Sequence, residues 1–585
     1  MKFKRLIIAL NSILLLTTCA VSAQQQLSGQ IYLNQLGFYP SGPKIAVVMA
    51  DDAQEFELHD AATGRVVLTG KLSAKRTLAT SNLTTKIADF SSFTHAGTYL
   101  ITVAGKGSTA PFRIANDLHH PVAVSSLKAF YYQRASMPLE AVYAGKWARA
   151  AGHPDTTVLI HPSAAEGKRT AKSTINTTGG WYDAGDYNKY IVNSGISTGT
   201  LLAAYEDFPS YFDTLKTQIP AEGKKVPDLL LETLYNIRWM LRMQDPADGG
   251  VYNKCTNTHF DAMIMPDQAV QPRYVVQKGT AATLNLAAVA AQAARIFKHY
   301  PQQYPGLADS CLKAAVKAWG WAEKHPDVAY DQDEMNRKFE PQVTTGGYGD
   351  DKFGDEWIWS AAELFISTGS KVYYDAIWSR LNDATGIPGW SYVSMLGYYS
   401  LQRNLKSLPD YSKGMTGIMK KRILTIADRY IEVLSSHIFD TVFGDARSDY
   451  NWGSNSTVAN QGILLINAYL MTGEQKYITA AISNLDYLMG RNATGYCFVT
   501  GMGVKSPLHP HHRPSVADGI EAPVPGFLVG GPNYEKQDKA AYTSNEPELS
   551  YTDLDSSYAS NEVAINWNAP LVYISNAIEA LQKKK

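Results

Sequence analysis

Residues 227–245 read PDLLLETLYNIRWMLRMQD, and this stretch decides the fold class of most of the chain. Its apolar side chains recur at the spacing of one helix face, at Leu230, Leu234, Ile237 and Leu241. Pro227 suits the first turn of a helix, because its missing amide proton is not needed there. The stretch therefore predicts an amphipathic helix with one buried face.

The same period recurs toward the C-terminus, in residues 280–300, 312–325, 356–368, 422–439, 460–472 and 478–491. FISTGSKVYYDAI (365–377) and LMTGEQKYITAAI (470–482) each place a glycine after one helix and then begin another. Such a glycine is a common helix stop, so the resemblance between the two stretches predicts repeated helical hairpins. Strands rich in Val and Ile do not alternate with the helices, so we expect residues 118–585 to form an all-α domain, closed into a toroid, rather than an α/β core.

The N-terminal part has a different pattern. Seven short apolar runs, separated by turn-forming residues, lie at 30–40, 44–50, 55–60, 65–72, 84–90, 97–105 and 110–115. This spacing leaves no room for helices and predicts an antiparallel β-sandwich of immunoglobulin size over residues 28–115. The segment lacks a row of Trp residues, so we expect it to brace the second domain rather than to bind carbohydrate.

The first 23 residues have the organisation of an export signal. A basic start, Lys2, Lys4 and Arg5, precedes the apolar run LIIALNSILLL, and Val21-Ser22-Ala23 forms a cleavage site. LTTC, ending at Cys19, is an alternative, poorer lipoprotein box. We expect cleavage after Ala23 and an exported protein, periplasmic or secreted.

Composition excludes several classes of protein. The 54 Lys and Arg residues balance 54 Asp and Glu residues, which argues against a nucleic-acid partner. With 45% hydrophobic and 18% charged residues, global disorder is excluded. No other apolar run is long enough for a membrane span, and we expect a monomer. The cysteines after Cys19 match no zinc or redox pattern; free buried thiols are favoured, with one disulfide as the alternative.

Three glycine- and aromatic-rich stretches could carry chemistry. GGWYDAGDYNKYIVNSG (179–195) holds two aspartates three positions apart, and TGMGVKSPLHPHHRPS (500–515) holds three histidines and an arginine. ELSYTDLDSSYASNEVAINWNAP (548–570) carries Asp553, Asp555 and Glu562. Each also has a structural interpretation, as a turn, a zinc ligand set or a helix start. Carboxyl groups among Trp and Tyr nevertheless suit glycoside hydrolysis, which needs one protonated and one ionised carboxyl group.

A serine hydrolase is an alternative that the sequence formally permits. Gly195-Ile196-Ser197-Thr198-Gly199 matches the GxSxG nucleophile elbow. The elbow needs a parallel sheet and an oxyanion loop, and the sequence indicates neither. We therefore set this interpretation aside.

The three stretches together resemble glycoside hydrolase family 9, in the form with an N-terminal immunoglobulin-like domain. IYLNQLGFYPSGPKIAVV (31–48) is similar to the opening strands of that domain, and GGWYDAGDYNKY is similar to the family's aspartate loop. GVKSPLHPHHR (503–513) and YTDLDSSYASNEVAINWNA (551–569) are similar to its histidine and acidic signatures. The resemblance covers residues 28–585 and implies an (α/α)6 barrel after the immunoglobulin-like sandwich.

The resemblance also implies roles for individual residues. Asp186 would be the general base that deprotonates water, Asp183 would hold that water, and Glu562 would be the general acid. His511 and Asp553 would complete the catalytic site. We expect the substrate-binding residues to be Trp181, Trp452, Arg513 and Tyr558.

The implied activity is inverting hydrolysis of β-1,4-glucosidic bonds in cellulose-like β-glucans or their oligosaccharides, as an endoglucanase. An exo-acting enzyme that releases glucose, cellobiose or glucosamine, and a non-catalytic glycan-binding protein, are the alternatives. Retention of all three carboxyl groups argues against the latter, since binding needs no acid and base.

The resemblance implies no cofactor for the reaction. Asp351, Gly354, Asp355 and Glu356 resemble a calcium loop of some family members, although the further aspartate ligand is not evident in residues 389–396. Oxygen ligands suit a structural calcium ion. The cysteine-histidine zinc site of some relatives is absent.

Overall fold

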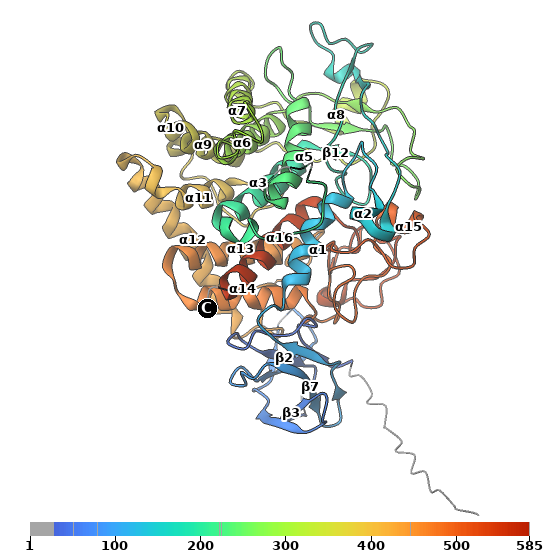
Figure 1. Ribbon diagram of the computed structural model, residues 1–585, viewed down its shortest axis with the longest axis vertical. Coiled ribbons are helices and arrows are strands. Elements are labelled where there is room, and N and C mark those ends of the chain that lie inside the picture. Colours follow the sequence, from blue (N-terminus) through green and yellow to red (C-terminus); the bar gives the residue numbers. More distant parts are fainter. Residues whose placement is uncertain are drawn as a thin grey trace, which may run out of the picture.

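The computed structural model describes residues 29–50, 52–78, 80–221, 223, 225–444 and 446–583. It contains a small β domain and a large helical domain, which lie one above the other in Figure 1. The predicted export signal lies outside the described residues. No helix of the described part is long and apolar enough to span a membrane.

The N-terminal domain is built from nine strands in two antiparallel sheets. The strands are β1 (Ile31–Tyr32), β2 (Ile45–Val48), β3 (Glu55–Asp60), β4 (Val66–Lys71), β5 (Arg76–Thr77), β6 (Thr84–Asp89), β7 (Gly97–Val103), β8 (Gly107–Ser108) and β9 (Phe112–Ile114). One sheet has the order β1-β2-β6-β5, and the other has the order β4-β3-β7-β8 with β9 also paired to β7. Apolar side chains of both sheets, among them Val48, Phe56 and Ile101, form one buried core between them. All seven predicted strands are present, and β5 and β8 are additional short ones.

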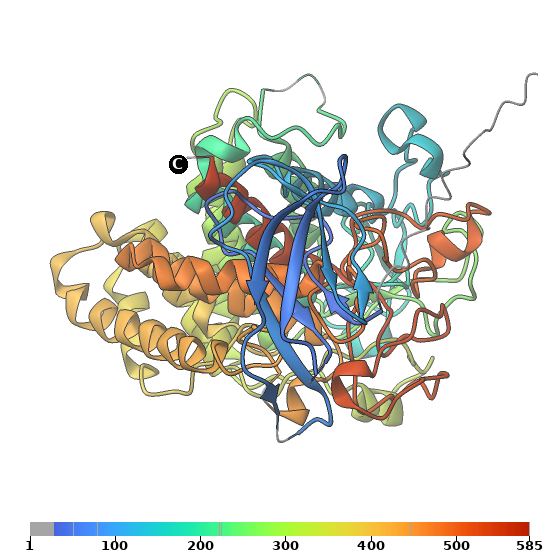
Figure 2. The same ribbon diagram turned by 90° about the horizontal axis from the view of Figure 1, so that it is seen from below.

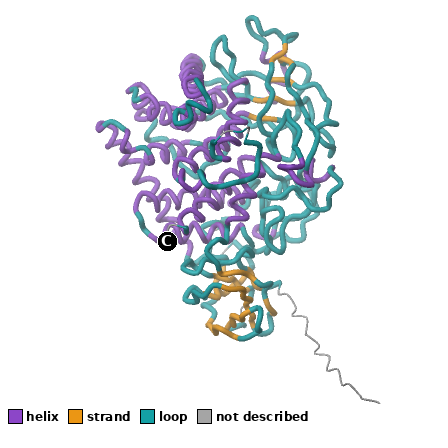
Figure 3. The backbone as a smooth tube through the Cα atoms, in the orientation of Figure 1, coloured by secondary structure: helices purple, strands orange, loops and turns teal. Residues whose placement is uncertain are grey.

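The second domain is mainly helical. Its longer helices are α1 (His120–Tyr132), α3 (Ile191–Asp207), α5 (Asp228–Arg242), α6 (Thr280–Phe297), α7 (Leu307–Lys324), α9 (Gly354–Thr368), α10 (Lys371–Ser379), α11 (Ser394–Arg403), α12 (Lys413–Leu434), α13 (Ser454–Thr472), α14 (Gln475–Leu488) and α16 (Ile565–Gln582). The shorter ones are α2 (Ala141–Ala144), α4 (Pro209–Phe212), α8 (Gln332–Lys338) and α15 (Arg513–Ala517). Helices gather on one side of this domain and loops on the other (Figure 3).

Enclosed and outer helices alternate along the chain. α3 packs on α6, α6 on α9, α9 on α11, α13 on α16, and α16 back on α3. These helices are buried over most of their surface, whereas the outer helices α7, α10 and α12 each bury one face. The outer helices α5 and α14 are also buried along most of their length. Each outer helix packs on an enclosed helix adjacent in sequence. The active-site loops described below connect these helices.

Every stretch predicted as helical from its period forms a helix, namely α5, α6, α7, α9, α12, α13 and α14. Gly369 and Gly473, which follow α9 and α13, have φ angles of 70° and 75°, as expected for glycine helix stops. The period did not detect α1, α3, α11 and α16. α3, α11 and α16 are buried over most of their length, so their polar and apolar residues do not separate onto two faces. α6 is equally enclosed, and its long Ala- and Leu-rich run was detected nevertheless.

The expectation of an all-α second domain needs one correction. A five-stranded sheet with the order β11-β10-β14-β13-β12 lies among its loops, formed by β10 (Val158–Ile160), β11 (Thr174–Ile175), β12 (Lys189–Tyr190), β13 (Lys254–Thr256) and β14 (Tyr274–Val275). Strands of two or three residues are too short to show a two-residue period, so the sequence pattern could not reveal them.

The two domains share a buried interface, and Figure 2 shows the sandwich in front of the helices. Ile45, Val47 and Ile87 of the sandwich pack against Ile438 and Phe439 of the helical domain. Polar side chains cross the same boundary: the Tyr39 hydroxyl donates to Glu579 Oε2 at 2.6 Å, and Asn34 Nδ2 donates to Asp486 Oδ1 at 2.7 Å. Both acceptors lie on helices of the second domain, so the sandwich completes the hydrogen bonding of that domain.

Candidate active site

The acidic residues of two predicted motifs meet in one cleft of about 710 Å³. Asp183 and Asp186 come from the loop before α3, and Glu562 comes from the segment before α16. The other lining residues are mostly aromatic or small, and include Tyr190, Phe260, Tyr348, Trp390, Tyr392, Trp452 and Trp567. The fold thus brings together carboxyl groups that are 376 positions apart in sequence.

The aspartate loop is fixed at both ends. Asp183 N donates to Asn188 O at 3.0 Å, which closes the loop on itself, and Ile565 N donates to Asp183 O at 2.8 Å, which ties it to the start of α16. On its far side the loop continues into β12, where Tyr190 pairs with Lys254 and Lys189 with Cys255 of β13. Two aspartates three positions apart are therefore carried on a rigid turn.

Asp183 is buried, and both of its carboxyl oxygens are occupied. Asn193 Nδ2 donates to Oδ1 at 2.9 Å and the Tyr348 hydroxyl donates to Oδ2 at 2.9 Å. Burial, together with the charge of Asp186, raises the pKa of Asp183 to about 8. Asp183 is therefore well placed to hold a proton or a water molecule beside Asp186.

Asp186 is held through one oxygen. Asn188 donates to Oδ2 through its side-chain amide and, at 3.3 Å, through its backbone N–H. The Tyr190 hydroxyl also donates to Oδ2, at 3.4 Å. Among the described residues, these bonds leave Oδ1 for a water molecule in the cleft.

Glu562 lines the same cleft as Asp183 and Asp186, and its carboxyl group accepts a hydrogen bond from the Gly185 backbone of the aspartate loop. Residue 562 forms a parallel bridge with His511, and Gly530 N donates to Glu562 O at 2.9 Å, so its backbone is held from two sides. Burial raises the pKa of Glu562 well above its ordinary value, and the charges of Asp186 and Asp183 add to the shift. A raised pKa favours the protonated form, which is what a general acid requires.

The histidine motif crosses the aspartate loop at Gly185. A Cβ atom at this position would lie 2.2 Å from His511 O, so the two backbones can approach only because residue 185 is glycine. Arg513 closes the crossing: its Nη1 donates to Gly185 O at 2.8 Å, and Nε and Nη2 donate to Asp261 O at 3.0 and 2.8 Å. The arginine is 6% exposed. Its guanidinium thus joins backbone segments beside Glu562, and its predicted contact with the sugar stays a prediction.

His511 and Asp553 occupy the wall behind Glu562. His511 Nδ1 lies 2.6 Å from Asp555 O, and the imidazole ring lies 6.0 Å from the ring of Tyr558. The Asp553 carboxylate accepts hydrogen bonds from Leu508 N at 2.8 Å and His509 N at 2.9 Å. Asp553 thus shapes the histidine loop, which ties the second and third motifs together.

The predicted aromatic contacts divide into two groups. Trp452 and Tyr558 are 44% and 37% exposed, their rings lie 5.4 Å apart, and Trp452 lines the cleft. Trp181 is fully buried, and its Nε1 donates to Glu232 Oε1 at 2.9 Å. The prediction that Trp181 contacts the sugar is therefore corrected: its ring packs against Phe130 behind the cleft.

Sequence reasoning missed several residues of the site. Tyr348 binds Asp183 directly, and Trp390 packs edge-on against Tyr348 at 5.2 Å. Phe260 is 45% exposed at the mouth of the cleft. These residues lie outside the three motifs, and the only signal for Tyr348 was its place in the glycine-rich run GGYGDD at 346–351.

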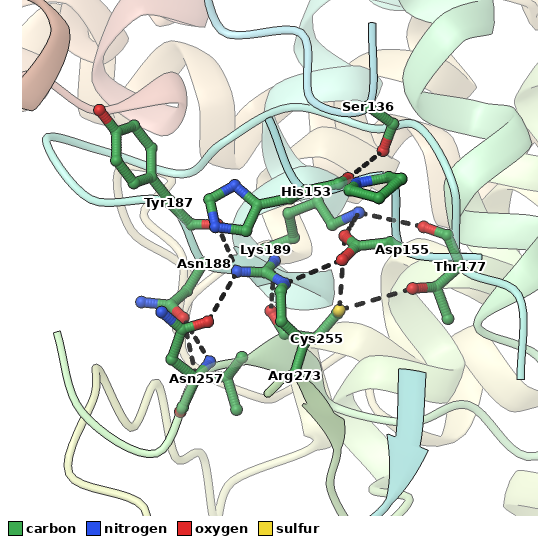
Figure 4. A network of polar contacts seen from close by, with 12 residues as sticks. Ser136, His153, Asp155, Thr177, Tyr187, Asn188, Lys189, Cys255, Asn257 and Arg273 are labelled. Atoms are coloured by element: carbon green, nitrogen blue, oxygen red, sulfur yellow. Dashed lines mark hydrogen bonds and ion pairs between the residues drawn. The ribbon is translucent and has the colours of Figure 1, made fainter. Parts of the chain in front are cut away.

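A buried ion-pair cluster supports the aspartate loop from behind (Figure 4). Asp155 pairs with Lys189 at 2.6 Å and with Arg273 at 3.0 Å. Lys189 Nζ also donates to Thr177 O and Gly179 O, before the aspartates, while Arg273 Nη1 donates to Tyr187 O, after them. One buried carboxylate thus anchors both ends of the loop.

The predicted calcium loop forms an acidic cluster at the start of α9. Both carboxylate oxygens of Glu356 and one of Asp350 are buried without a hydrogen-bond partner, and Asp355 Oδ2 accepts from Val393 N at 2.6 Å. Burial raises the pKa of all three carboxyl groups. Asp351 is exposed, so Asp350 and not Asp351 supplies the side chain near Glu356. Hard oxygen atoms are the ligand type that calcium prefers, and this is the part of the expectation that these side chains meet.

A second acidic group, Glu166, Asp245 and Asp248, has ligand atoms close enough together for a metal. Lys278 already lies among them. Its Nζ is 3.0 Å from Asp245 and 2.8 Å from Asp248, and it also contacts Glu166. The lysine supplies the positive charge, and we assign no metal here.

Two alternatives from the sequence can now be settled. Ser197 lies inside helix α3, fully buried, and its hydroxyl donates to Asn193 O at 2.6 Å, so GxSxG is a helix segment and no nucleophile elbow. Cys255, Cys311 and Cys497 are free and buried, as favoured.

An aromatic-lined cleft with one proton-retaining carboxyl group facing a pair of aspartates defines a glycoside hydrolase. Comparison with known proteins narrows the class. Residues 120–575 match Glycosyl hydrolase family 9, and residues 26–108 match the Cellulase N-terminal ig-like domain. The chain therefore belongs to glycosyl hydrolase family 9.

Individual relatives agree with this assignment. The chain is 45% identical to the xyloglucan-specific endo-beta-1,4-glucanase of Bacteroides ovatus, over 98% of each chain. It is 31% identical to Endoglucanase D of Acetivibrio thermocellus, over 94% of this chain and 84% of the relative. The solved structure described as Bacteroides ovatus GH9 superposes with a TM-score of 0.90 at 45% identity, and covers 94% of this chain and 99% of its own.

Proposed function

We propose that this protein is an endo-acting, inverting glycoside hydrolase that cleaves β-1,4-glucosidic bonds in β-glucans. The observation that carries the proposal is the convergence of Asp183, Asp186 and Glu562 on one cleft lined by aromatic side chains. Family membership and the named activities of the relatives support it.

Glu562 is the proposed general acid. It must carry a proton at the working pH and deliver it to the glycosidic oxygen as the bond breaks. Its raised pKa, caused by burial and by the nearby aspartates, supports this role. After transfer the carboxylate is ionised, and solvent protonates it again before the next cycle.

Asp186 is the proposed general base. Its Oδ1 accepts a proton from water while the water oxygen attacks the anomeric carbon, and the proton reaches solvent after the product leaves. Asp183 and Tyr348 limit the positions that this water can take, because they are joined by a 2.9 Å hydrogen bond beside it. Water attacks from the face opposite the leaving oxygen, so the product has the inverted configuration.

The aromatic residues are proposed to hold the glucan. Trp452 and Tyr558 present exposed rings on which a pyranose face can stack, and Trp390, Tyr392 and Phe260 line the rest of the cleft. Their rings contribute apolar area with little loss of conformational entropy.

The proposed substrate is a branched β-1,4-glucan of the xyloglucan type. The activity named for the Bacteroides ovatus relative supports this choice. The lining of the cleft also includes the small residues Gly347, Gly389 and Ser391. A Cβ atom at Gly389 would meet no atom within 4 Å, so there is open space at this position for a branch of the substrate.

Product analysis over time tests the activity and the substrate together. Xyloglucan, mixed-linkage glucan, a soluble cellulose derivative and chitosan oligosaccharides are digested at equal mass. We expect a rapid fall in xyloglucan chain length before small products accumulate. Release of glucose or cellobiose units from the start would favour the exo-acting alternative, and no cleavage of any substrate would favour a binding protein.

We also infer that the helices close into an (α/α)6 barrel. The alternation of enclosed and outer helices and the return of α16 onto α3 support this arrangement. We further propose export, on the basis of the sequence of residues 1–23, and a structural calcium ion bound by Asp350, Asp355 and Glu356. The calcium ion would stabilise the start of α9 and take no part in the reaction.

A further inference from the structure

Lys254 is a buried cation without a counter-ion near the catalytic cleft. Its ammonium group donates to three neutral acceptors, Gln332 Oε1 at 2.6 Å, Gly346 O at 2.7 Å and Thr345 Oγ1 at 3.1 Å. Among the described residues, no carboxylate forms an ion pair with it. A charge buried in this way is costly, so its retention calls for a function.

A continuous hydrogen-bond chain runs from Lys254 to Asp186. Thr345 Oγ1 lies 2.6 Å from Thr256 Oγ1, and the Thr256 hydroxyl donates to Asn188 Oδ1 at 2.9 Å. The Asn188 amide then donates to Asp186 Oδ2. Lys254 and Thr256 lie in β13, and Asn188 immediately precedes β12, so the small sheet carries the chain.

The chemistry of the donors gives this chain a direction. An ammonium group can only donate, so the Thr345 hydroxyl accepts from Lys254. Either hydroxyl can donate in the Thr345–Thr256 bond, and we take Thr345 as the donor. Thr256 divides its proton between Asn188 Oδ1 and Asn257 O, which lies at 2.8 Å. Every bond then points from the cation toward the catalytic carboxylate.

A second contact fixes the orientation of the Asn188 side-chain amide, with its oxygen toward Asn257 and its nitrogen toward Asp186. The backbone N–H of Asn257 donates to Asn188 Oδ1 at 2.9 Å. A backbone N–H cannot accept a hydrogen bond, so the amide oxygen must face Asn257 and the amide nitrogen must face Asp186. Asn188 is therefore held as a donor to the catalytic carboxylate and cannot turn over.

We propose that Lys254 is a positioning residue that acts on Asp186 through Thr345, Thr256 and Asn188, holding its Oδ2 and favouring its ionised form. Successive hydrogen bonds polarise one another, so a positive charge at one end strengthens the last donor to the carboxylate. The proposal rests on the proposed role of Asp186 as general base.

Other titratable and aromatic groups lie near Lys254 and near Asp186, the two ends of the hydrogen-bond chain. Their charges also affect the pH profile that the experiment measures. Lys254 faces the rings of Tyr190 and Tyr330, and its charge lowers the pKa of His161. The groups around Asp186 are Asp183, Tyr190, Glu562 and His511. Burial lowers the pKa of Lys254 well below its ordinary value, and the charge of Asp186 only partly opposes this lowering. We take Lys254 as the ammonium form because three acceptors surround its Nζ.

The test compares Thr256→Val, which removes only the hydroxyl, with Thr256→Ser, which keeps it. We expect Thr256→Val to lower kcat by about threefold to tenfold with little change in KM, and to move the acidic limb of the kcat/KM profile to higher pH. Thr256→Ser should restore both values. Thr233→Val is the matched control, because Thr233 is equally buried and its hydroxyl bonds only its own helix.

Lys254→Met extends the test to the cation. It should lower kcat by at least about tenfold and shift the acidic limb in the same direction, since a lost positive charge makes Asp186 harder to ionise. In the double variant with Thr256→Val, the losses should be less than additive, because both changes interrupt one chain. If Lys254→Met does not fold, the threonine pair alone decides the question.

Two outcomes separate this proposal from the proposed function. A Thr256→Val enzyme with wild-type kcat and pH profile, or equal losses in the valine and serine variants, would overturn the hydrogen-bond chain while leaving Asp186 as the base. Full activity of Asp186→Ala would instead remove the base itself.

Discussion

The three carboxyl groups of the cleft differ in their hydrogen bonding and in their proposed chemical roles, because their surroundings differ. Asp183 has both oxygens bonded, Asp186 has one oxygen bonded and the other facing the cleft, and Glu562 is enclosed beside two negative charges. Acid and base roles follow from these environments rather than from residue type, since aspartate and glutamate have similar ordinary pKa values.

The role of Glu562 predicts a difference between leaving groups. Glu562→Gln should abolish most activity on a natural glucan, because the leaving alkoxide needs a proton. With an aryl glycoside that leaves as a stable phenolate, the loss should be much smaller. Initial rates on both substrates, with circular dichroism to confirm folding, measure this. Equal losses on the two would count against Glu562 as the acid.

The roles of Asp186 and Asp183 predict the stereochemistry. Inverting enzymes place their carboxyl groups about 6.5–9.5 Å apart, against about 5–5.5 Å for a covalent route. We expect the wider range for Asp186 and Glu562, and proton NMR of early hydrolysis should show the α-anomer first. Asp186→Ala should be nearly inactive, and Asp183→Ala severely impaired but less so. A β-anomer appearing first would contradict the mechanism.

The raised pKa of Asp183 predicts how stability varies with pH. The pKa rises from 3.8 to about 8 on folding, so the folded state favours the protonated form. The contribution of Asp183 to stability is complete below the lower value and is lost as pH rises through the upper one. Asp183→Asn keeps a neutral side chain at every pH, so the difference in melting temperature should change in favour of the variant from about pH 4 to about pH 8 and stay constant above that. A constant difference across this range would show that Asp183 titrates normally.

At the scale of elements, helices on the surface and helices in the interior differ in what their sequences reveal. α5 and α14 have one apolar face and were predicted, whereas α3 and α16 are enclosed on all sides and were not. The cleft is bounded by the segments that precede these two enclosed helices. The best-predicted helices are therefore not the ones that position the site.

The start of α9 predicts a response to metal removal. A chelator should lower the melting temperature, because Asp350, Asp355 and Glu356 would then face one another without a cation. Added calcium should restore it, and Glu356→Gln should weaken the response. Glu166→Gln is the control, since Lys278 already supplies the charge there. If the chelator has no effect on the wild type, the carboxyl groups are held by shared protons instead.

At the scale of the whole molecule, the sandwich braces the helical domain. Asn34 and Tyr39 satisfy Asp486 and Glu579, which are buried acidic groups of that domain. Val66 and Val67 are the exposed large apolar side chains of the described part of the sandwich, and neither is aromatic. Among the described residues of the sandwich, no Phe, Tyr or Trp ring is exposed, and Tyr32 and Phe93 are half-buried.

Deleting residues 28–115 should lower the melting temperature and the yield of soluble protein. Each buried acceptor left without its donor costs about 1–3 kcal/mol. Tyr39→Phe, which removes one hydroxyl, should show a fraction of this loss, and Val66→Thr on the exposed face should show none. Binding of xyloglucan or cellulose by the isolated sandwich would assign it a different function.

The sequence alone determined the order of the two domains, seven strands, seven helices and the three motifs of the site, because these depend on local periods and on residues adjacent in the chain. Tertiary structure decided which motif residues reach the cleft. Trp181 and Arg513 belong to the motifs but are buried, while Tyr348, Trp390 and Phe260 reach the cleft from outside them. The physical reason is that burial, pKa and contact across a cleft depend on atoms distant in sequence. The hydrogen-bond chain from Lys254 to Asp186 forms only where β13, the aspartate loop and the loop that carries Thr345 meet.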